Sequence, residues 1–406
     1  MLLIESRGWK RKVTGLLYKR ANNSLKMRDL SPGFYRFSFL VLLLTLGSGS
    51  SLAETRFDSQ VQAFTVRTIN DNLKNPWSMV FLSSFELLIS EKAGALQRLS
   101  LEDGSIQEIS GLPEVKLKGQ GGLMGLALHP DFINTRWLYM AYTAGSWGEY
   151  GTEVLRARLE GDQLLEQKVI FRAAKKSSGG RHFGSRLLFD QKGQLFISLG
   201  DRGSKKFAQD LNDHRGSLVR LNDDGSVPED NPFISRQRAR AEIYSLGHRN
   251  IQGLAMQASG QLWAHEHGPQ GGDELNLIEA GSNYGWPVIT YGVNYGIGTR
   301  IGEGTHKEGM QQPAHKWIPS IAPSGMVFYR GERFPGWKDN LFVGSLKFGQ
   351  LVRLQLNEKQ VIHEERLLDN KFGRIRDVAE SPDGYLYLLT DAARGKLLKL
   401  IPLNDN

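Results

Sequence analysis

A short pattern of apolar and polar positions recurs along the chain: an apolar strand, a turn containing Asp, Gly or Pro, and a second strand rich in aromatic residues. Alternating apolar residues bounded by turn-forming residues are typical of β-hairpins. The pattern occurs six times, at 77–90, 125–142, 185–200, 252–266, 324–344 and 377–391. Further short apolar strands follow most copies, at 96–100, 154–159, 351–354 and 396–400.

Six copies spaced roughly 45 to 75 residues apart predict an all-β fold, a six-bladed β-propeller. A β-sandwich whose hairpins resemble one another by accident is the alternative. Because no long segment has an apolar period of 3.6 residues, we expect very little helix. In a propeller the loops that lead into the blades gather at one mouth of the central channel. Residues far apart in sequence can therefore meet there, and we expect the active site at this mouth.

The N-terminal segment has the features of an export signal. Arg36 precedes the apolar run FSFLVLLLTL, and small residues then lead to Ala53. This order predicts a secretory signal in residues 1–53 with cleavage after Ala53, and a periplasmic location. The run is short for a bilayer crossing, so a retained anchor is the less favoured alternative, and we expect no stable membrane insertion after cleavage. Residues 54–406 are then predicted to form a single propeller domain.

Charge and cysteine content narrow the possible functions. The chain has a net charge of +8, but residues 1–53 hold nine lysines and arginines against two acidic residues, so the remainder carries only about +1. The high isoelectric point therefore gives no support to nucleic-acid binding. The chain has no cysteine, which excludes disulfides, thiolate metal sites and a thiol nucleophile.

One segment, 267–287, combines five glycines and two prolines with acidic and amide residues. We expect it to be a rigid, turn-rich loop, neither a helix nor a central strand, with carbonyl and carboxylate oxygens pointing inward. Calcium prefers such an oxygen shell. An ordinary glycine-rich connection between strands is the alternative.

Several polar residues lie just before or between the repeats, where loops at the mouth are expected. Taken singly, each has an ordinary structural explanation. Taken together, the cations, the imidazole and the amides indicate a site for a polyanionic ligand with a metal, because guanidinium groups bind carboxylates in a bidentate manner and imidazole can accept a hydroxyl proton. These residues are Gln120, His182, Arg249, Asn250, Lys347, Arg374 and Arg376.

The motifs GQGGLMGLALHPDF, RHFGSRLLF, LGHRN, EHGPQGGDELN and NYGWP occur in this order along the chain. As a set they resemble those of the soluble pyrroloquinoline quinone (PQQ)-dependent glucose/sorbosone dehydrogenases, and most of all the periplasmic aldose sugar dehydrogenases. The resemblance runs from about Val66 to Leu400. It implies oxidation of an aldose sugar at C1 to the lactone, with hydride transfer to the quinone, and a soluble or membrane electron acceptor as partner.

The resemblance also assigns roles to individual residues. His182 would be the general base for the anomeric hydroxyl, and Arg249 would stabilise negative charge on the cofactor during its reduction. The other residues implied to contact PQQ are Gln120, Asn250, Tyr295, Lys347, Arg374 and Arg376.

Two calcium sites follow from the same resemblance. Backbone carbonyls at Gly268 and Pro269 would hold a catalytic Ca²⁺ that acts as a Lewis acid. Glu274 and Tyr284, the latter through its main-chain oxygen, would hold a structural Ca²⁺.

The chain departs from the glucose dehydrogenase branch at Arg181, where that branch has an acidic residue, and this difference puts glucose in doubt as the preferred substrate. Two other functions stay open. A calcium-dependent propeller lactonase or hydrolase would need several acidic side chains in the channel, whereas this chain offers more cations. A non-catalytic binding module would be expected to have lost the base or the carboxylate-binding arginines, which are present here.

Overall fold

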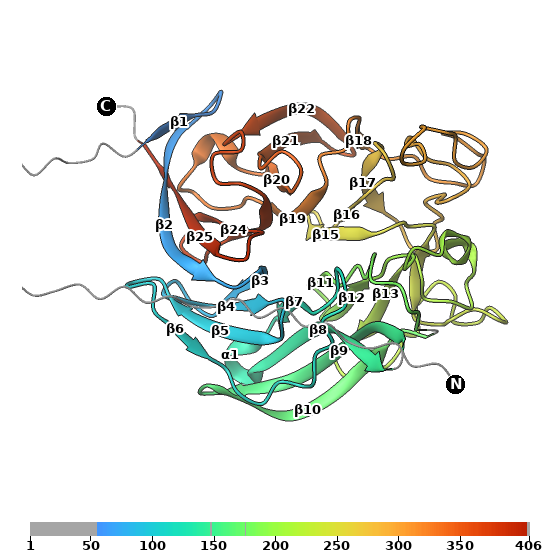
Figure 1. The fold of residues 1–406 in the computed structure, drawn as a ribbon, viewed down its shortest axis with the longest axis horizontal. Helices are drawn as coiled ribbons and strands as arrows, with labels where there is room; N and C mark the ends of the chain where they lie inside the picture. Colours follow the sequence, from blue (N-terminus) through green and yellow to red (C-terminus); the bar gives the residue numbers. More distant parts are fainter. Residues whose placement is uncertain (1–54, 147, 175, 404–406) are drawn as a thin grey trace, which may run out of the picture. The chain divides into compact units, whose positions relative to one another are not determined.

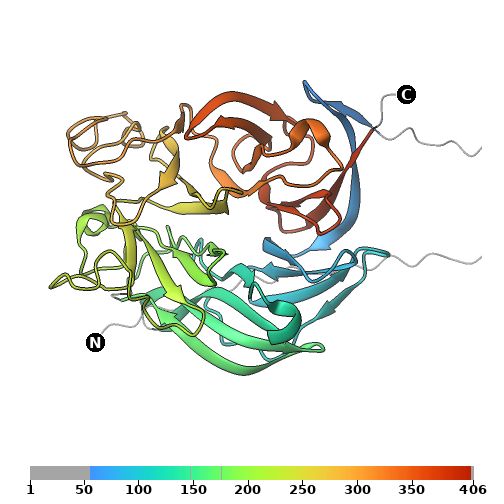
Figure 2. The same cartoon turned by 180° about the vertical axis from the view of Figure 1, so that it is seen from behind.

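Six antiparallel sheets are arranged as blades around a common axis (Figure 1, Figure 2). The computed structural model describes residues 55–146, 148–174 and 176–403. The predicted signal sequence, residues 1–53 with cleavage after Ala53, lies outside the described residues. The six-bladed β-propeller expected from the repeats is confirmed.

The first strand of each blade lies innermost, and each inner strand contacts the next one until the last returns to the first. The inner strands are β3 (Pro76–Phe81), β7 (Leu123–Leu128), β11 (Leu187–Phe189), β15 (Ile251–Met256), β19 (Pro323–Phe328) and β23 (Ile375–Glu380). Their hairpin partners are β4 (Glu86–Glu91), β8 (Trp137–Ser146), β12 (Gln194–Ser198), β16 (Leu262–Glu266), β20 (Leu341–Ser345) and β24 (Leu386–Thr390). Each of the six sequence repeats therefore forms the two innermost strands of one blade.

The outer strands complete the four-stranded sheets. They are β5 (Ala95–Ser100), β6 (Ile106–Glu108), β9 (Glu149–Glu160), β10 (Gln163–Arg172), β13 (Ser217–Asn222), β14 (Ile243–Leu246), β17 (Asp273–Ile278), β18 (His315–Trp317), β21 (Leu351–Asn357) and β22 (Gln360–Leu367). Within the described residues, helix is limited to α1 (Phe132–Thr135) and the short 3₁₀ turns Lys205–Gln209 and Pro335–Trp337, as expected. Among these residues, no helix has the length and apolar character that a membrane crossing needs.

The last blade joins the two ends of the described chain. Its sheet has the order β1-β2-β25-β24-β23, where β1 is Arg56–Asp58, β2 is Ala63–Leu73 and β25 is Gly395–Pro402. Strand β2 pairs antiparallel with β25, from Phe64 opposite Pro402 to Leu73 opposite Gly395. Figure 1 shows the blue β2 beside the red β25. The ring is thus closed by backbone hydrogen bonds between strands that are more than 300 residues apart.

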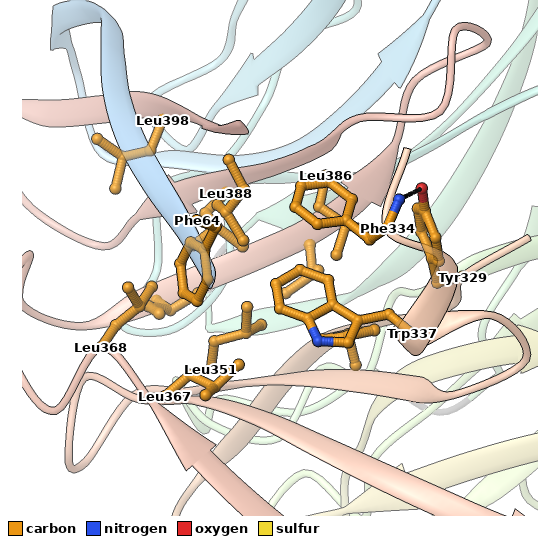
Figure 3. Packing of buried hydrophobic residues seen from close by; sticks show 14 residues of the cluster. Phe64, Tyr329, Phe334, Trp337, Leu351, Leu367, Leu368, Leu386, Leu388 and Leu398 are labelled. Atoms are coloured by element: carbon orange, nitrogen blue, oxygen red, sulfur yellow. Dashed lines mark hydrogen bonds between the residues drawn. The ribbon is translucent and has the colours of Figure 1, made fainter. Parts of the chain in front are cut away.

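An aromatic cluster packs this blade against its neighbour (Figure 3). Trp337 stacks on Phe334 with ring centroids 4.4 Å apart, and Phe64 from β2 meets the edge of Trp337 at 5.2 Å. The Tyr329 hydroxyl accepts a hydrogen bond from the Phe334 backbone N–H at 3.0 Å, so even the polar atom of this cluster is satisfied. Burial of such large side chains supplies much of the stability of the fold.

The expectation for segment 267–287 was wrong in one respect: Asp273–Ile278 forms β17, an interior strand of its blade. All five glycines lie outside this strand, three before it and two after it. Within it, Leu275 is fully buried in a core cluster, and Leu277, two residues later on the same face of the strand, packs against the same cluster. Pairing with β16 and β18 therefore makes this stretch a strand despite the glycines on both sides of it.

Antiparallel order determines which loops meet. The start of each inner strand and the turn between the second and third strands lie at the same end of a blade. Loops that precede β7, β11, β15 and β23 thus share one end of the propeller with the turns β4–β5, β12–β13, β16–β17, β20–β21 and β24–β25.

Candidate active site

His182 and Asp201 form a buried pair at this end of the propeller. His182 Nδ1 lies 2.6 Å from Asp201 Oδ1. The same carboxylate accepts hydrogen bonds from Trp286 Nε1 at 2.9 Å and from the Gly203 backbone N–H at 2.6 Å. The backbone N–H of His182 donates to Gln120 Oε1 at 2.7 Å. Because Asp201 accepts the proton on Nδ1, the lone pair of the ring is left on Nε2.

The surroundings keep this imidazole neutral. Burial lowers the pKa of His182; the hydrogen bond to Asp201 opposes this shift, and the nearby Arg249 adds to it. Burial acts to raise the pKa of Asp201, but the hydrogen bonds that it accepts from His182, Gly203 and Trp286 outweigh burial and leave that pKa below its usual range. A neutral base beside an ionised carboxylate is the protonation state that proton abstraction requires.

Arg249 and Asn250 come from the loop before β15 and lie next to this pair. The backbone N–H of Arg249 donates to the Glu266 carboxylate, and its Nη1 donates to the carbonyl of His267 at 3.0 Å. Its guanidinium lies 5.5 Å from the Trp286 ring centroid. Asn250 Oδ1 accepts from the Gly184 backbone N–H at 3.2 Å. These contacts tie the loops before β11 and β15 together.

Two of the predicted carboxylate-binding arginines share an internal carboxylate. Asp391 Oδ2 lies 2.9 Å from Arg376 Nη2 and 2.8 Å from Arg374 Nη2. Arg374 also donates to the carbonyl of Leu346 at 3.1 Å, one residue before Lys347. Arg376 Nε is buried with no partner among the described residues, while Lys347 is exposed. Arg376 and Lys347 therefore have N–H groups that remain available to a ligand.

Lys92, in the turn β4–β5, was not singled out from the sequence. Its Nζ donates to the carbonyl of Gly119 at 2.6 Å, one residue before Gln120. Burial, and then repulsion from Arg376, lower its pKa. Lys92 thus lies between Gln120 and Arg376 and adds another cation to the group.

A buried ion pair lies beneath these residues. Arg186 Nη1 is 2.7 Å from Asp377 Oδ1, and Arg186 Nη2 donates to the carbonyl of Arg376 at 3.2 Å. A cavity of about 760 Å³ extends along the inner strands from this pair. It is also lined by Pro130 and Asp190, which lie in turns at the opposite end of the blades. This cavity is therefore distinct from the His182 group.

The predicted calcium ligands lie in two places. The Gly268 backbone N–H donates to Asp273 Oδ1 at 2.9 Å, and the other oxygen of Asp273 accepts from Ser320 Oγ at 2.6 Å and from the Ala322 N–H at 2.9 Å. The start of the loop that carries Gly268 and Pro269 is thereby fixed. Its neighbour His267 accepts the Arg249 hydrogen bond, so this loop adjoins the His182 group.

Several side-chain oxygen atoms that could bind a metal ion lie around Glu274. Glu274 on β17 lies opposite Glu266 on β16, and Asn276 Nδ2 reaches both carboxylates, at 3.5 Å and 3.4 Å. Burial, and then repulsion from Glu266, raise the pKa of Glu274 to about 8. Asn276 Oδ1 is buried without a partner among the described residues. Lys316, opposite Glu274 on β18, offsets only part of this charge, and two carboxylates with an amide oxygen fit a hard divalent ion.

The remaining predicted residues are placed differently. The Tyr284 hydroxyl donates to the carbonyl of Leu277 at 2.6 Å and accepts from the Glu279 N–H, which leaves its main-chain oxygen as the candidate ligand. Tyr295 is 69% exposed, and the structure gives no contact between it and the other predicted residues. No group of three or more His, Asp or Glu side chains within residues 55–403 has an arrangement suited to a metal.

Comparison with known proteins agrees with the fold and the motifs. Residues 73–399 match the glucose/sorbosone dehydrogenase family. The aldose sugar dehydrogenase YliI of Escherichia coli strain K12 is 43% identical over 373 residues, which cover 90% of this chain and 98% of that protein. The apo crystal structure of the soluble aldose sugar dehydrogenase from E. coli has a TM-score of 0.81 at 42% identity, over 84% of this chain and 100% of that one.

A PQQ-bound aldose sugar dehydrogenase from Streptomyces coelicolor is also similar. Its structure has a TM-score of 0.71 at 28% identity, over 84% of this chain and 98% of that one. The family match runs from the end of β2 into β25 and includes the segments that carry His182, Arg249 and Arg376. The chain therefore belongs to the glucose/sorbosone dehydrogenase family.

Proposed function

We propose that this chain is a PQQ-dependent aldose sugar dehydrogenase that oxidises the anomeric carbon of its substrate to the lactone. Family membership and the activities named for its relatives support this assignment. The observation that carries it is the buried His182–Asp201 pair beside Arg249, which supplies a neutral base, an orienting carboxylate and a cation within one group.

His182 acts as the general base in this proposal. Its Nε2 accepts the proton of the anomeric hydroxyl, while Asp201 holds the ring orientation and stabilises the imidazolium that forms. Arg249 stabilises negative charge that develops nearby, and its own position is fixed by Glu266 and His267.

The residues fit a planar tricarboxylate such as PQQ. Arg376 has a buried Nε donor without a partner in the described part of the chain, Lys347 is exposed, and Lys92 lies between Arg376 and Gln120. Together with Arg374 these cations match several carboxylates. When bound, PQQ supplies the two-electron acceptor that takes hydride from the sugar C1.

The residues also fit calcium. Carbonyls of Gly268 and Pro269 would hold a catalytic ion that serves as a Lewis acid. Glu274, Asn276 and the Tyr284 main-chain oxygen would hold a second ion, which would relieve the repulsion between Glu266 and Glu274.

Reconstitution tests the proposal. Purified protein stripped of metal and cofactor should gain dye-linked oxidation of aldoses only when both PQQ and Ca²⁺ are added. Activity with a nicotinamide cofactor, or no turnover with any aldose of a broad panel, would contradict it. Hydrolysis of lactones by the calcium-loaded protein without PQQ would favour the hydrolase alternative. Export belongs to the same proposal, and the intact mass of the periplasmic protein would test cleavage after Ala53.

Replacing Arg376 with alanine should weaken PQQ binding by about 1.5–3 kcal/mol, the range for hydrogen bonds to charged groups. Asp391 would keep Arg374 as its partner, so the loop itself should persist. Absorbance titration of the apo-protein with PQQ measures the change. Arg366, which pairs with Glu364 on the outer strand β22, offers a matched control. Equal PQQ affinity in the Arg376→Ala and Arg366→Ala variants would argue against a carboxylate contact at Arg376.

A further inference from the structure

Arg202 directly follows Asp201, and its guanidinium contacts the chain around His182: two backbone carbonyls before this residue and the ring of Phe183 after it. The side chain is buried, with 8% of the residue exposed. Nη1 donates to the carbonyl of Arg181, and Nη2 donates to the carbonyl of Gly179. The guanidinium carbon also lies 3.3 Å from the centroid of the Phe183 ring. Residues 179, 181 and 183 are thus all held by one side chain.

The segment 179–183 needs such support because it belongs to no strand. His182 has a φ of 55°, in the left-handed region, which is unfavourable for a residue other than glycine. A conformation of this kind persists only where surrounding contacts enforce it. Gln120 supplies two of these contacts, since its N–H donates to the Gly180 carbonyl at 2.7 Å and its Oε1 accepts from His182.

We propose that Arg202 is a positioning residue for His182: Asp201 orients the imidazole ring, and Arg202 fixes the backbone from which that ring projects. The inference rests on the proposed function, because it assigns Arg202 a part in placing the general base. Asp201 and Arg202 are consecutive residues. One short stretch of chain therefore holds both the imidazole ring of His182 and the backbone around it. Burial lowers the pKa of Arg202 to about 10, which leaves the guanidinium charged and fully able to donate at neutral pH.

The Arg202→Ala variant should lower kcat on the order of 10²-fold, because a misplaced catalytic group loses the alignment that bound reactants need. The Michaelis constant for the aldose and the PQQ dissociation constant should change little, since no predicted cofactor contact involves Arg202. The primary isotope effect on kcat with an aldose deuterated at C1 should rise, because bond cleavage becomes slower relative to the other steps. The Arg202→Lys variant keeps the charge but lacks the fork, and should recover only part of the rate.

Arg215 provides a matched control. It is half-buried, its guanidinium lies 3.5 Å from the Phe207 ring centroid, and it pairs with Asp213. None of its hydrogen bonds reaches segment 179–183. The Arg215→Ala variant should lower the unfolding temperature while kcat and the isotope effect stay at the wild-type values. If Arg202→Ala behaves in the same way, with no change in kcat or isotope effect, Arg202 has only a structural role and the inference fails.

A second measurement separates this inference from the proposed function. In the apo-protein, the NMR signal of the His182 Nδ1 proton reports its hydrogen bond to Asp201 without any turnover. The Arg202→Ala variant should broaden or shift this signal, and Arg215→Ala should not. If the Nδ1 proton signal is unchanged in Arg202→Ala, the inference is overturned, even where the wild-type protein oxidises aldoses. If the signal shifts, the positioning of His182 by Arg202 is supported, even where the wild-type protein does not oxidise them. Should Arg202→Ala fail to fold, the same comparison with Arg202→Lys decides, with a smaller change in the same direction.

Discussion

Replacing His182 with alanine is expected to lower kcat by roughly 10²–10⁴-fold, the usual contribution of a positioned general base. The affinity for PQQ should remain near that of the wild type, because the cations assigned to the cofactor carboxylates lie in other loops. Dye-linked steady-state kinetics at saturating PQQ and Ca²⁺ measure the loss, and an absorbance titration measures cofactor binding.

His129 gives a matched control for this substitution. It lies in the β7–β8 turn, at the opposite end of the blades, where its Nδ1 accepts from the Asp131 backbone N–H at 3.1 Å. The His129→Ala variant should keep the wild-type kcat. A His182→Ala variant that binds PQQ poorly, yet turns over normally once saturated, would show that His182 is a cofactor contact and not the base.

Replacing Asp201 with asparagine should lower kcat on the order of 10²-fold or more, nearly as much as the loss of His182. The amide no longer keeps a proton on Nδ1 of His182 and no longer stabilises the imidazolium. The pH profile should change as well. Asp201 is the group that raises the pKa of His182, while burial and the charges of Arg249 and Arg181 lower it. Removal of the carboxylate leaves only lowering influences, so the acidic limb of kcat should move to lower pH.

The Asp190→Asn variant is the control for this experiment. Asp190 caps the β11–β12 turn of the same blade, at the opposite end, where it accepts from the Lys192 and Gln194 backbone N–H groups. The Asp190→Asn variant should have a lower unfolding temperature and the same pH profile of kcat as the wild type. An acidic limb that moves to higher pH in Asp201→Asn, or a kcat equal to that of the wild type, would contradict the role given to Asp201.

The fold could be predicted because each blade is built from local hairpins. The alternation of apolar residues and the turn residues between them lie within about 15 to 20 residues, so the pattern survives in the sequence. The third and fourth strands are less regular, and β17 was taken for a loop because the glycines on both sides of it dominated the segment. Pairing of β17 with β16 and β18 depends on neighbours that the local sequence does not reveal.

The candidate site was predicted in part. His182 and Arg249 stood out because each lies in a distinctive motif, and Arg374 and Arg376 stood out because guanidinium groups suit the binding of carboxylates. Asp201 and Asp391 did not stand out in the sequence. Each lies in the turn after the second strand of its blade, and these turns lie at the same end of the propeller as His182. The sequence around Lys92 contains no motif that indicates a site residue. Its significance comes from contacts with loops of other blades, which only the closed ring brings together.

The pairing of β2 with β25 has a consequence for the order of assembly. Arg376 and Asp391 flank β24, in the one blade whose sheet requires both the first and the last strands of the described chain. The other five sheets each come from a continuous stretch of chain and can form one after another. Because β25 pairs with both β24 and β2, we expect the segment that carries Arg376 and Asp391 to reach its final position only when the ring closes.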